Sequence, residues 1–163
     1  MSDSVWVIAP PQREAKNLAS ELGIPLQIAQ ILVNRKIRDP ETAHRFLYGT
    51  LDELHDPYLM TGMREAVERI QRAIAQKEKI LIFGDYDVDG VLSVVMLLKA
   101  LEFLGAERDY FIPERLKEGY GIKEKHIEVA LKKAARLIIS ADCGTKASGF
   151  VKRAKEHGID VII

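Results

Sequence analysis

The stretch that most constrains this chain runs from Lys79 to Leu104, KILIFGDYDVDGVLSVVMLLKALEFL. It begins with a short apolar, strand-forming run, Ile80 to Phe83, passes through an acidic turn that ends at Gly90, and continues as a long apolar helical segment. A strand followed by an acidic turn and a helix is how an α/β protein presents ligands at the carboxyl edge of a parallel sheet. The stretch therefore predicts a parallel α/β fold with a functional edge.

The acidic turn places carboxylates at alternate positions, Asp85, Asp87 and Asp89. Because such closely spaced groups repel one another unless a cation neutralises them, the turn predicts a divalent metal site. An EF-hand calcium loop opens with the same pattern, but it needs a Glu at its twelfth position and a helix ahead of it. Here Met96 and a predicted strand occupy those places, which excludes the calcium loop. A polar turn without metal remains an alternative, as does an aspartyl phosphotransferase, whose nucleophilic Asp also follows a strand.

The bulk properties bound the class of protein. A length of 163 residues with 47% hydrophobic residues is enough for one domain, or slightly more, with a sizeable core. Lys plus Arg and Asp plus Glu number 24 each, so contact with nucleic acid requires a local patch of charge. The lone Cys143 fits a reducing compartment, no apolar run approaches the roughly 18 residues of a membrane span, and the N-terminus lacks the pattern of a signal peptide. We therefore expect a soluble cytoplasmic protein without membrane contact.

Residues 1–60 predict a small helical lead-in with no sustained strand pattern. Ile28, Ile31 and Leu32 share one face of a predicted helix in this part. Asp39 is expected to cap a further helix, whose first residue is proline. Small helices packed beside a sheet domain are the expected outcome.

Residues 61–163 predict an α/β domain. Its first helix is amphipathic, and Arg69 is expected on the side that faces water. Strands and helices then alternate, which is the signature of a parallel, doubly wound sheet, and the sequence stops in mid-strand at Ile163. The predicted strands are 80–83, 109–113, 136–140 and 159–163, and the predicted helices are 61–76, the segment after Gly90, 123–135 and 147–157.

A further aspartate, Asp142, follows the predicted strand 136–140. Because parallel strands put their carboxyl ends on one edge of the sheet, Asp142 is expected to converge on Asp87 and Asp89. Oxygen ligands favour Mg²⁺ or Mn²⁺ over zinc, and two such metals can generate a hydroxide and stabilise an in-line phosphoryl displacement. An ordinary cap of the next helix is the alternative interpretation of Asp142.

The connection Arg115–Gly121, RLKEGYG, has the residue types of a nucleic-acid contact. Arg115 suits a bidentate phosphate contact, Tyr120 can stack on a base, and Gly119 and Gly121 permit close backbone approach. Taken alone, a segment of this composition is more often a solvated loop than a site. None of the four histidines has ligand spacing, so the sequence assigns them no catalytic role.

Three motifs in this order resemble the DHH phosphoesterase family, in particular its single-stranded-DNA exonucleases. They are GDYDVDG after a strand, ERLKEGYG and SADCG, and the lead-in segments LGIPLQIAQIL, NRKI and LHDPYLM extend the likeness over nearly the whole chain. The resemblance implies a Mn²⁺- or Mg²⁺-dependent exonuclease that trims single-stranded DNA from its 5′ end to mononucleotides during repair and recombination. It also implies that Asp87, Asp89 and Asp142 are catalytic metal ligands, that Asp85 is a supporting ligand, and that Arg115–Gly121 lies near the substrate strand.

The Asp-His-His motif of that family would be expected just after Ile163, followed by a later acidic ligand and a second domain that completes the DNA cleft. We therefore expect the chain to be a fragment that is inactive alone, with single-strand-binding protein and a helicase as candidate partners of the complete protein. The alternatives are a non-catalytic relative that binds replication or repair partners and a small-substrate phosphoesterase of the same family. The three retained aspartates of the first motif favour the nuclease, and the lead-in argues against the small-substrate enzyme.

Overall fold

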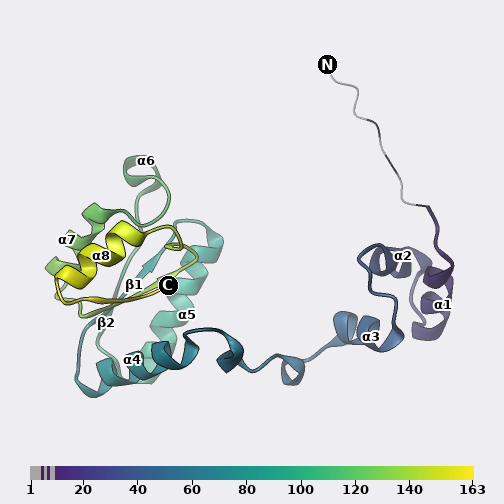
Figure 1. Cartoon of the computed structure of the whole chain (residues 1–163), viewed down its shortest axis with the longest axis horizontal. Helices are drawn as coiled ribbons and strands as arrows, with labels where there is room; N and C mark the ends of the chain where they lie inside the picture. The colour runs from purple at the N-terminus through teal and green to yellow at the C-terminus, as the bar shows by residue number, and fades with distance from the viewer. Residues whose placement is uncertain (1–4, 6, 8–9) are drawn as a thin grey trace. The chain divides into compact units, whose positions relative to one another are not determined.

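The computed structural model describes residues 5, 7 and 10–163, and the chain forms two compact units, Met1–Asp56 and Pro57–Ile163 (Figure 1). The first residues of the predicted lead-in, 1–4, 6, 8 and 9, lie outside the described residues. The division into a lead-in and a domain beginning at residue 61 stays a prediction.

The first unit is a small helical cluster of α1 (Arg13–Leu22), α2 (Leu26–Asn34) and α3 (Pro40–Tyr48), followed by the 3₁₀ turn η1 (Leu51–Glu53). As predicted, Asp39 caps α3, since its carboxylate accepts the Thr42 N–H at 2.8 Å. The predicted apolar face of α2 is wrong: Ile28 and Ile31 are exposed, and Leu32 is buried. The small side chain of Ala29 lies beside Leu32 in the buried core, so α2 packs on this face instead.

The second unit alternates helices and strands as the sequence predicts, and every strand pair is parallel. The strand order is β2-β1-β3-β4, which confirms the α/β fold with a parallel sheet. The elements are η2 (Pro57–Leu59), α4 (Met63–Ala75), β1 (Ile80–Gly84), α5 (Val88–Phe103), β2 (Arg108–Phe111), α6 (Arg115–Glu118), η3 (Glu124–His126), α7 (Ile127–Lys132), β3 (Leu137–Ala141), α8 (Ser148–Glu156) and β4 (Asp160–Ile162).

Helices cover both faces of the sheet, so the sheet is doubly wound. Successive residues of β1 point to opposite faces: Ile80 and Ile82 belong to the core formed with α4 and α5, and Leu81 and Phe83 to the core formed with α7 and α8. Figure 1 shows α5 in teal on one side of the strands and α8 in yellow on the other. Because the connections from β1 and from β2 lead to opposite sides of β1, the switch point of the topology lies between β1 and β3.

Arg69 of α4 does not face water as predicted. Its side chain is only 12% exposed, and its guanidinium lies 2.7 Å from the Glu78 carboxylate and 2.5 Å from that of Asp160. The arginine therefore ties α4 to the start of β4, a partner that lies far along the chain.

None of the helices in the described residues has the length and apolar character that a membrane span requires.

Candidate metal centre

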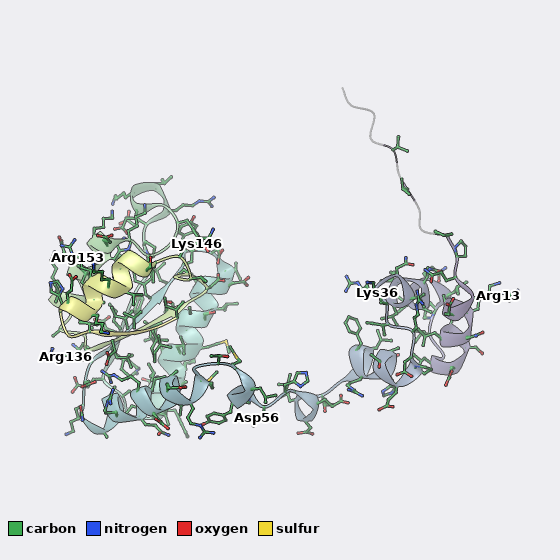
Figure 2. All side chains as sticks on the ribbon, in the orientation of Figure 1. Arg13, Lys36, Asp56, Arg136, Lys146 and Arg153 are labelled. Atoms are coloured by element: carbon green, nitrogen blue, oxygen red, sulfur yellow. The ribbon has the colours of Figure 1, made fainter. Side chains whose placement is uncertain are left out.

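The acidic residues of the two sequence motifs follow neighbouring strands at the switch point. Gly84 of β1 is paired with Ala141 of β3, so Asp85 and Asp142 come one residue after a matched pair of positions. Figure 2 labels Arg136, which directly precedes β3, and Lys146, in the loop that follows β3, and the acidic edge is the one on the Lys146 side. Ligands of open α/β sheets bind at this kind of edge.

The start of α5 lies directly on the end of β1, and Gly90 makes this possible. A Cβ at Gly90 would lie 2.5 Å from the carbonyl oxygen and 2.6 Å from the nitrogen of Asp85. The helix begins at Val88, because the Asp87 carboxylate accepts the Gly90 N–H at 3.0 Å and caps it. Asp89 consequently lies in the first turn of α5, where the helix dipole favours a negative charge.

Asp85 is the buried member of the cluster. The residue is 1% exposed, and among the described residues neither carboxylate oxygen has a hydrogen-bond partner. A buried carboxylate without hydrogen bonds or a counter-charge is costly, and a bound cation removes that cost. Asp85 therefore fits a cation at this edge better than it fits a polar turn.

Asp142 lies close enough to the first motif for the charges to interact. Partial loss of hydration raises the pKa of Asp142, although the residue is exposed, and the charges of Asp87 and Asp89 with a hydrogen bond to Asp87 raise it further. Asp142 has φ 59°, a left-handed conformation that Asp and Asn tolerate better than most residues. The raised pKa of Asp142 therefore agrees with the predicted convergence of Asp142 with the first motif.

The donors at this edge are oxygens, which suit a hard cation such as Mg²⁺ or Mn²⁺. In the part of the chain that the structure describes, no three acidic, histidine or cysteine side chains already form a closed metal cage, so the exposed carboxylates would have to turn inward around an ion. Burial, followed by the charges of Asp85 and Asp142, raises the pKa of Cys143 to about 11. The thiol is therefore protonated at neutral pH in the metal-free protein, and its soft sulfur is a poor match for a hard cation.

The predicted substrate-binding residues surround this edge. The Arg115 guanidinium lies 5.2 Å above the centre of the Tyr86 ring, and the Tyr120 hydroxyl donates to the Asp142 carbonyl oxygen at 3.4 Å. Gly119 and Gly121 both have positive φ, at 69° and 79°, so the glycines allow the turn that brings Tyr120 back to the sheet.

A hollow of about 660 Å³ opens beside the acidic edge. Its lining includes Tyr120, Asp142, Thr145 and Lys146. The hollow therefore places a cationic side chain and an aromatic side chain next to the carboxylates.

Sequence reasoning missed three residues of this region. Tyr86 lies within the first motif, and its position between Asp85 and Asp87 was the only sequence signal that it belongs to the site. Glu118 lies within the Arg115–Gly121 segment, and His126 follows that segment in the chain; nothing in the sequence marks His126 as buried. The contacts of these two residues depend on the tertiary fold.

Replacing Asp85 by asparagine is expected to raise the free energy of unfolding of the metal-free protein by about 1 kcal/mol or more, because it removes an unpaired buried charge. The same change is expected to reduce the rise in melting temperature that Mn²⁺ produces. Asp142→Asn is the comparison variant: because Asp142 is exposed, removing its repelled charge is expected to raise the metal-free melting temperature less than Asp85→Asn does, while also weakening the response to Mn²⁺. A metal-free Asp85→Asn protein less stable than wild type would contradict this account of Asp85.

Comparison with known proteins places this fold in a family. Residues 79–163 match the N-terminal domain of the DHH family. The single-stranded-DNA-specific exonuclease RecJ of Bacillus subtilis is 44% identical over 159 residues, which are 97% of this chain and 20% of that relative. A crystal structure of exonuclease RecJ bound to manganese matches with a TM-score of 0.59 at 35% identity, covering 63% of this chain and 26% of that chain. RecJ from Thermus thermophilus in complex with Mn²⁺ matches with a TM-score of 0.67 at 26% identity, covering 93% of this chain and 20% of that chain.

The chain belongs to the DHH family. The predicted resemblance to the single-stranded-DNA exonucleases of that family is also confirmed, because the relatives just described are RecJ exonucleases. The chain spans about a fifth of the length of the curated relative from Bacillus subtilis.

Proposed function

We propose that the full gene product is a Mn²⁺- or Mg²⁺-dependent exonuclease that removes mononucleotides from the 5′ end of single-stranded DNA in repair and recombination. The observation that carries this proposal is the gathering of acidic residues at the switch point of the sheet, where Asp85 is buried without a partner. Membership of the DHH family and the likeness to RecJ, named as a single-stranded-DNA-specific exonuclease, support the choice of substrate.

In this proposal Asp87, Asp89 and Asp142 hold the metal, and Asp85 supports it from the buried side. A metal held by these residues would supply the chemistry that activates water and neutralises charge on the phosphate. Asp87 has a second function as the cap of α5, which fixes its carboxylate relative to the end of β1.

The loop around α6 would hold the DNA strand. Arg115 is suited to a bidentate contact with phosphate, and Tyr120 to stacking on a base. Gly119 and Gly121, which carry no side chain, let the strand approach the backbone closely. We propose that this loop and the acidic edge bind consecutive parts of the same strand.

The 163-residue chain is expected to be inactive alone, and the activity is proposed for the full gene product. Single-strand-binding protein and a helicase are proposed partners, and the cytoplasm is the proposed location.

The proposal is tested with single-stranded DNA labelled at its 5′ or at its 3′ end. With Mn²⁺, the full gene product is expected to release the 5′ label at once as mononucleotide and the 3′ label only late, and to leave blunt duplex DNA intact. Degradation of short oligonucleotides or pyrophosphate alone would favour the small-substrate alternative. Absence of hydrolysis together with retained DNA binding would favour a non-catalytic relative.

A further inference from the structure

One carboxylate connects the substrate loop, defined here as Glu114–Gly121, to the body of the second unit. The side chain of Glu118 is 23% exposed, although it belongs to a loop that stands out from the sheet (Figure 1). One of its oxygens accepts the Glu114 N–H at 3.1 Å, which closes the loop on itself. The other oxygen lies 3.6 Å from Nε2 of His126 and 3.7 Å from Nζ of Lys125.

His126, the other residue of this contact, is buried in the core. It is 2% exposed, and its ring centre lies 5.3 Å from that of Phe83 in β1 and 5.5 Å from that of Phe111 in β2. Its Nδ1 accepts the Lys123 N–H at 3.0 Å, so the proton of the neutral ring is on Nε2. Burial lowers the pKa of His126, which keeps the ring neutral at physiological pH.

The Nε2–H group of His126 points toward one possible acceptor. Among the described residues this buried nitrogen has no hydrogen bond at normal distance, and the Glu118 carboxylate is the acceptor it faces. A second contact reinforces the same connection, because the Lys123 ammonium donates to the Glu118 carbonyl oxygen. Segment 123–126 therefore holds Glu118 through both its side chain and its backbone.

We propose that Glu118 and His126 are a positioning pair that sets the substrate loop over the metal centre. His126 is the fixed member, held by the aromatic rings of β1 and β2, and Glu118 is the member that carries the loop. The pair holds Arg115 over Tyr86 and Tyr120 against Asp142. Neither residue touches the reacting atoms, so loosening the pair weakens the binding of single-stranded DNA more than it slows the chemical step. This inference rests on the proposed function, because it assigns the loop to the substrate.

The test uses Glu118→Ala and His126→Phe in the full gene product. Phenylalanine keeps an aromatic ring in the core but has neither ring nitrogen, and Glu118→Gln is the conservative variant that retains an acceptor. Glu128→Ala, an exposed position on α7, is the matched control. Two readouts are needed: hydrogen exchange of the amides in Glu114–Gly121, and KM and kcat for single-stranded DNA.

Glu118→Ala and His126→Phe are each expected to raise the exchange rate of the loop amides and the KM about tenfold, because the first removes the acceptor of the Glu114 N–H and the second removes the acceptor of the Lys123 N–H, together with the contact between the two side chains. The kcat is expected to change by less than about threefold, and Glu118→Gln to recover most of the affinity. Amide exchange in β1 and β3 reports whether a variant is folded. If one of the two variants unfolds, the result for the folded variant decides whether the pair holds the loop. Unchanged loop exchange in the folded variants overturns the pair, and faster exchange with an unchanged KM overturns its function in substrate binding. If the wild-type protein does not degrade DNA, the proposed function fails, while loop exchange still decides whether the pair holds the loop.

Discussion

Asparagine in place of Asp87 or Asp142 is expected to lower the Mn²⁺-dependent degradation of single-stranded DNA by the full gene product at least about a hundredfold. Each change removes one negative charge from the proposed metal ligands and is compatible with the local backbone conformation and its hydrogen bonds. Asparagine caps helices as well as aspartate does, so the cap that Asp87 forms with Gly90 is retained. Asparagine also tolerates the φ of 59° at position 142. The loss of rate is therefore assigned to the charge.

The measurement is the steady-state release of mononucleotides, with melting temperatures recorded in parallel. The matched control is Glu128→Gln, which removes a carboxylate from an exposed position on α7 and is expected to retain wild-type turnover. Wild-type turnover in either aspartate variant would remove that residue from the site.

Alanine in place of Gly90 is expected to destabilise the protein by about 3 kcal/mol or more. The added Cβ would lie 2.5 to 2.7 Å from three backbone atoms of Asp85, and backbone at the end of a central strand cannot yield as a flexible side chain can. The packing of α5 on β1 is equally tight at Gly84 of β1, where a Cβ would have no room beside Val94 of α5. The same change is expected to push the start of α5 away from β1 and to weaken Mn²⁺ binding.

Gly105→Ala separates this packing effect from the general cost of losing a glycine. Gly105 has φ 70°, but a Cβ there would meet nothing within 4 Å. Its replacement is expected to cost about 1 kcal/mol, the ordinary cost of a positive φ without glycine. Both free energies of unfolding are measured by urea denaturation, and a Gly90→Ala cost no greater than that of Gly105→Ala would contradict the close approach of α5 to β1.

The fold was predictable because its signals are local. The apolar run at 80–83 and the alternation of strands and helices after it define a parallel sheet, and parallel strands end at one edge. That rule alone predicted that Asp142 would lie near the first motif. The pairing of Gly84 with Ala141 shows that β1 and β3 end at the same level, directly before Asp85 and Asp142.

The features that sequence reasoning missed depend on partners far along the chain. Arg69 looked solvent-facing in its helical pattern, yet its partner Asp160 lies at the start of the last strand. Ile28 and Ile31 fit an apolar face that the packing of α2 does not use. His126 belongs to a segment of mixed charge, and only the rings of β1 and β2 reveal that it is buried. Periodicity describes one element at a time and cannot identify which element it contacts.

The most direct test of the metal centre is the paramagnetic broadening of backbone amide signals by Mn²⁺, with Mg²⁺ as the diamagnetic control. Substoichiometric Mn²⁺ is expected to broaden the signals of 85–90 and 141–144 first and together, while those of Ile80 and Leu137 at the opposite edge of the sheet persist. Joint loss from the two turns would demonstrate one ion shared by both motifs. Broadening confined to one turn, or spread evenly over exposed carboxylates, would contradict a metal centre built from both.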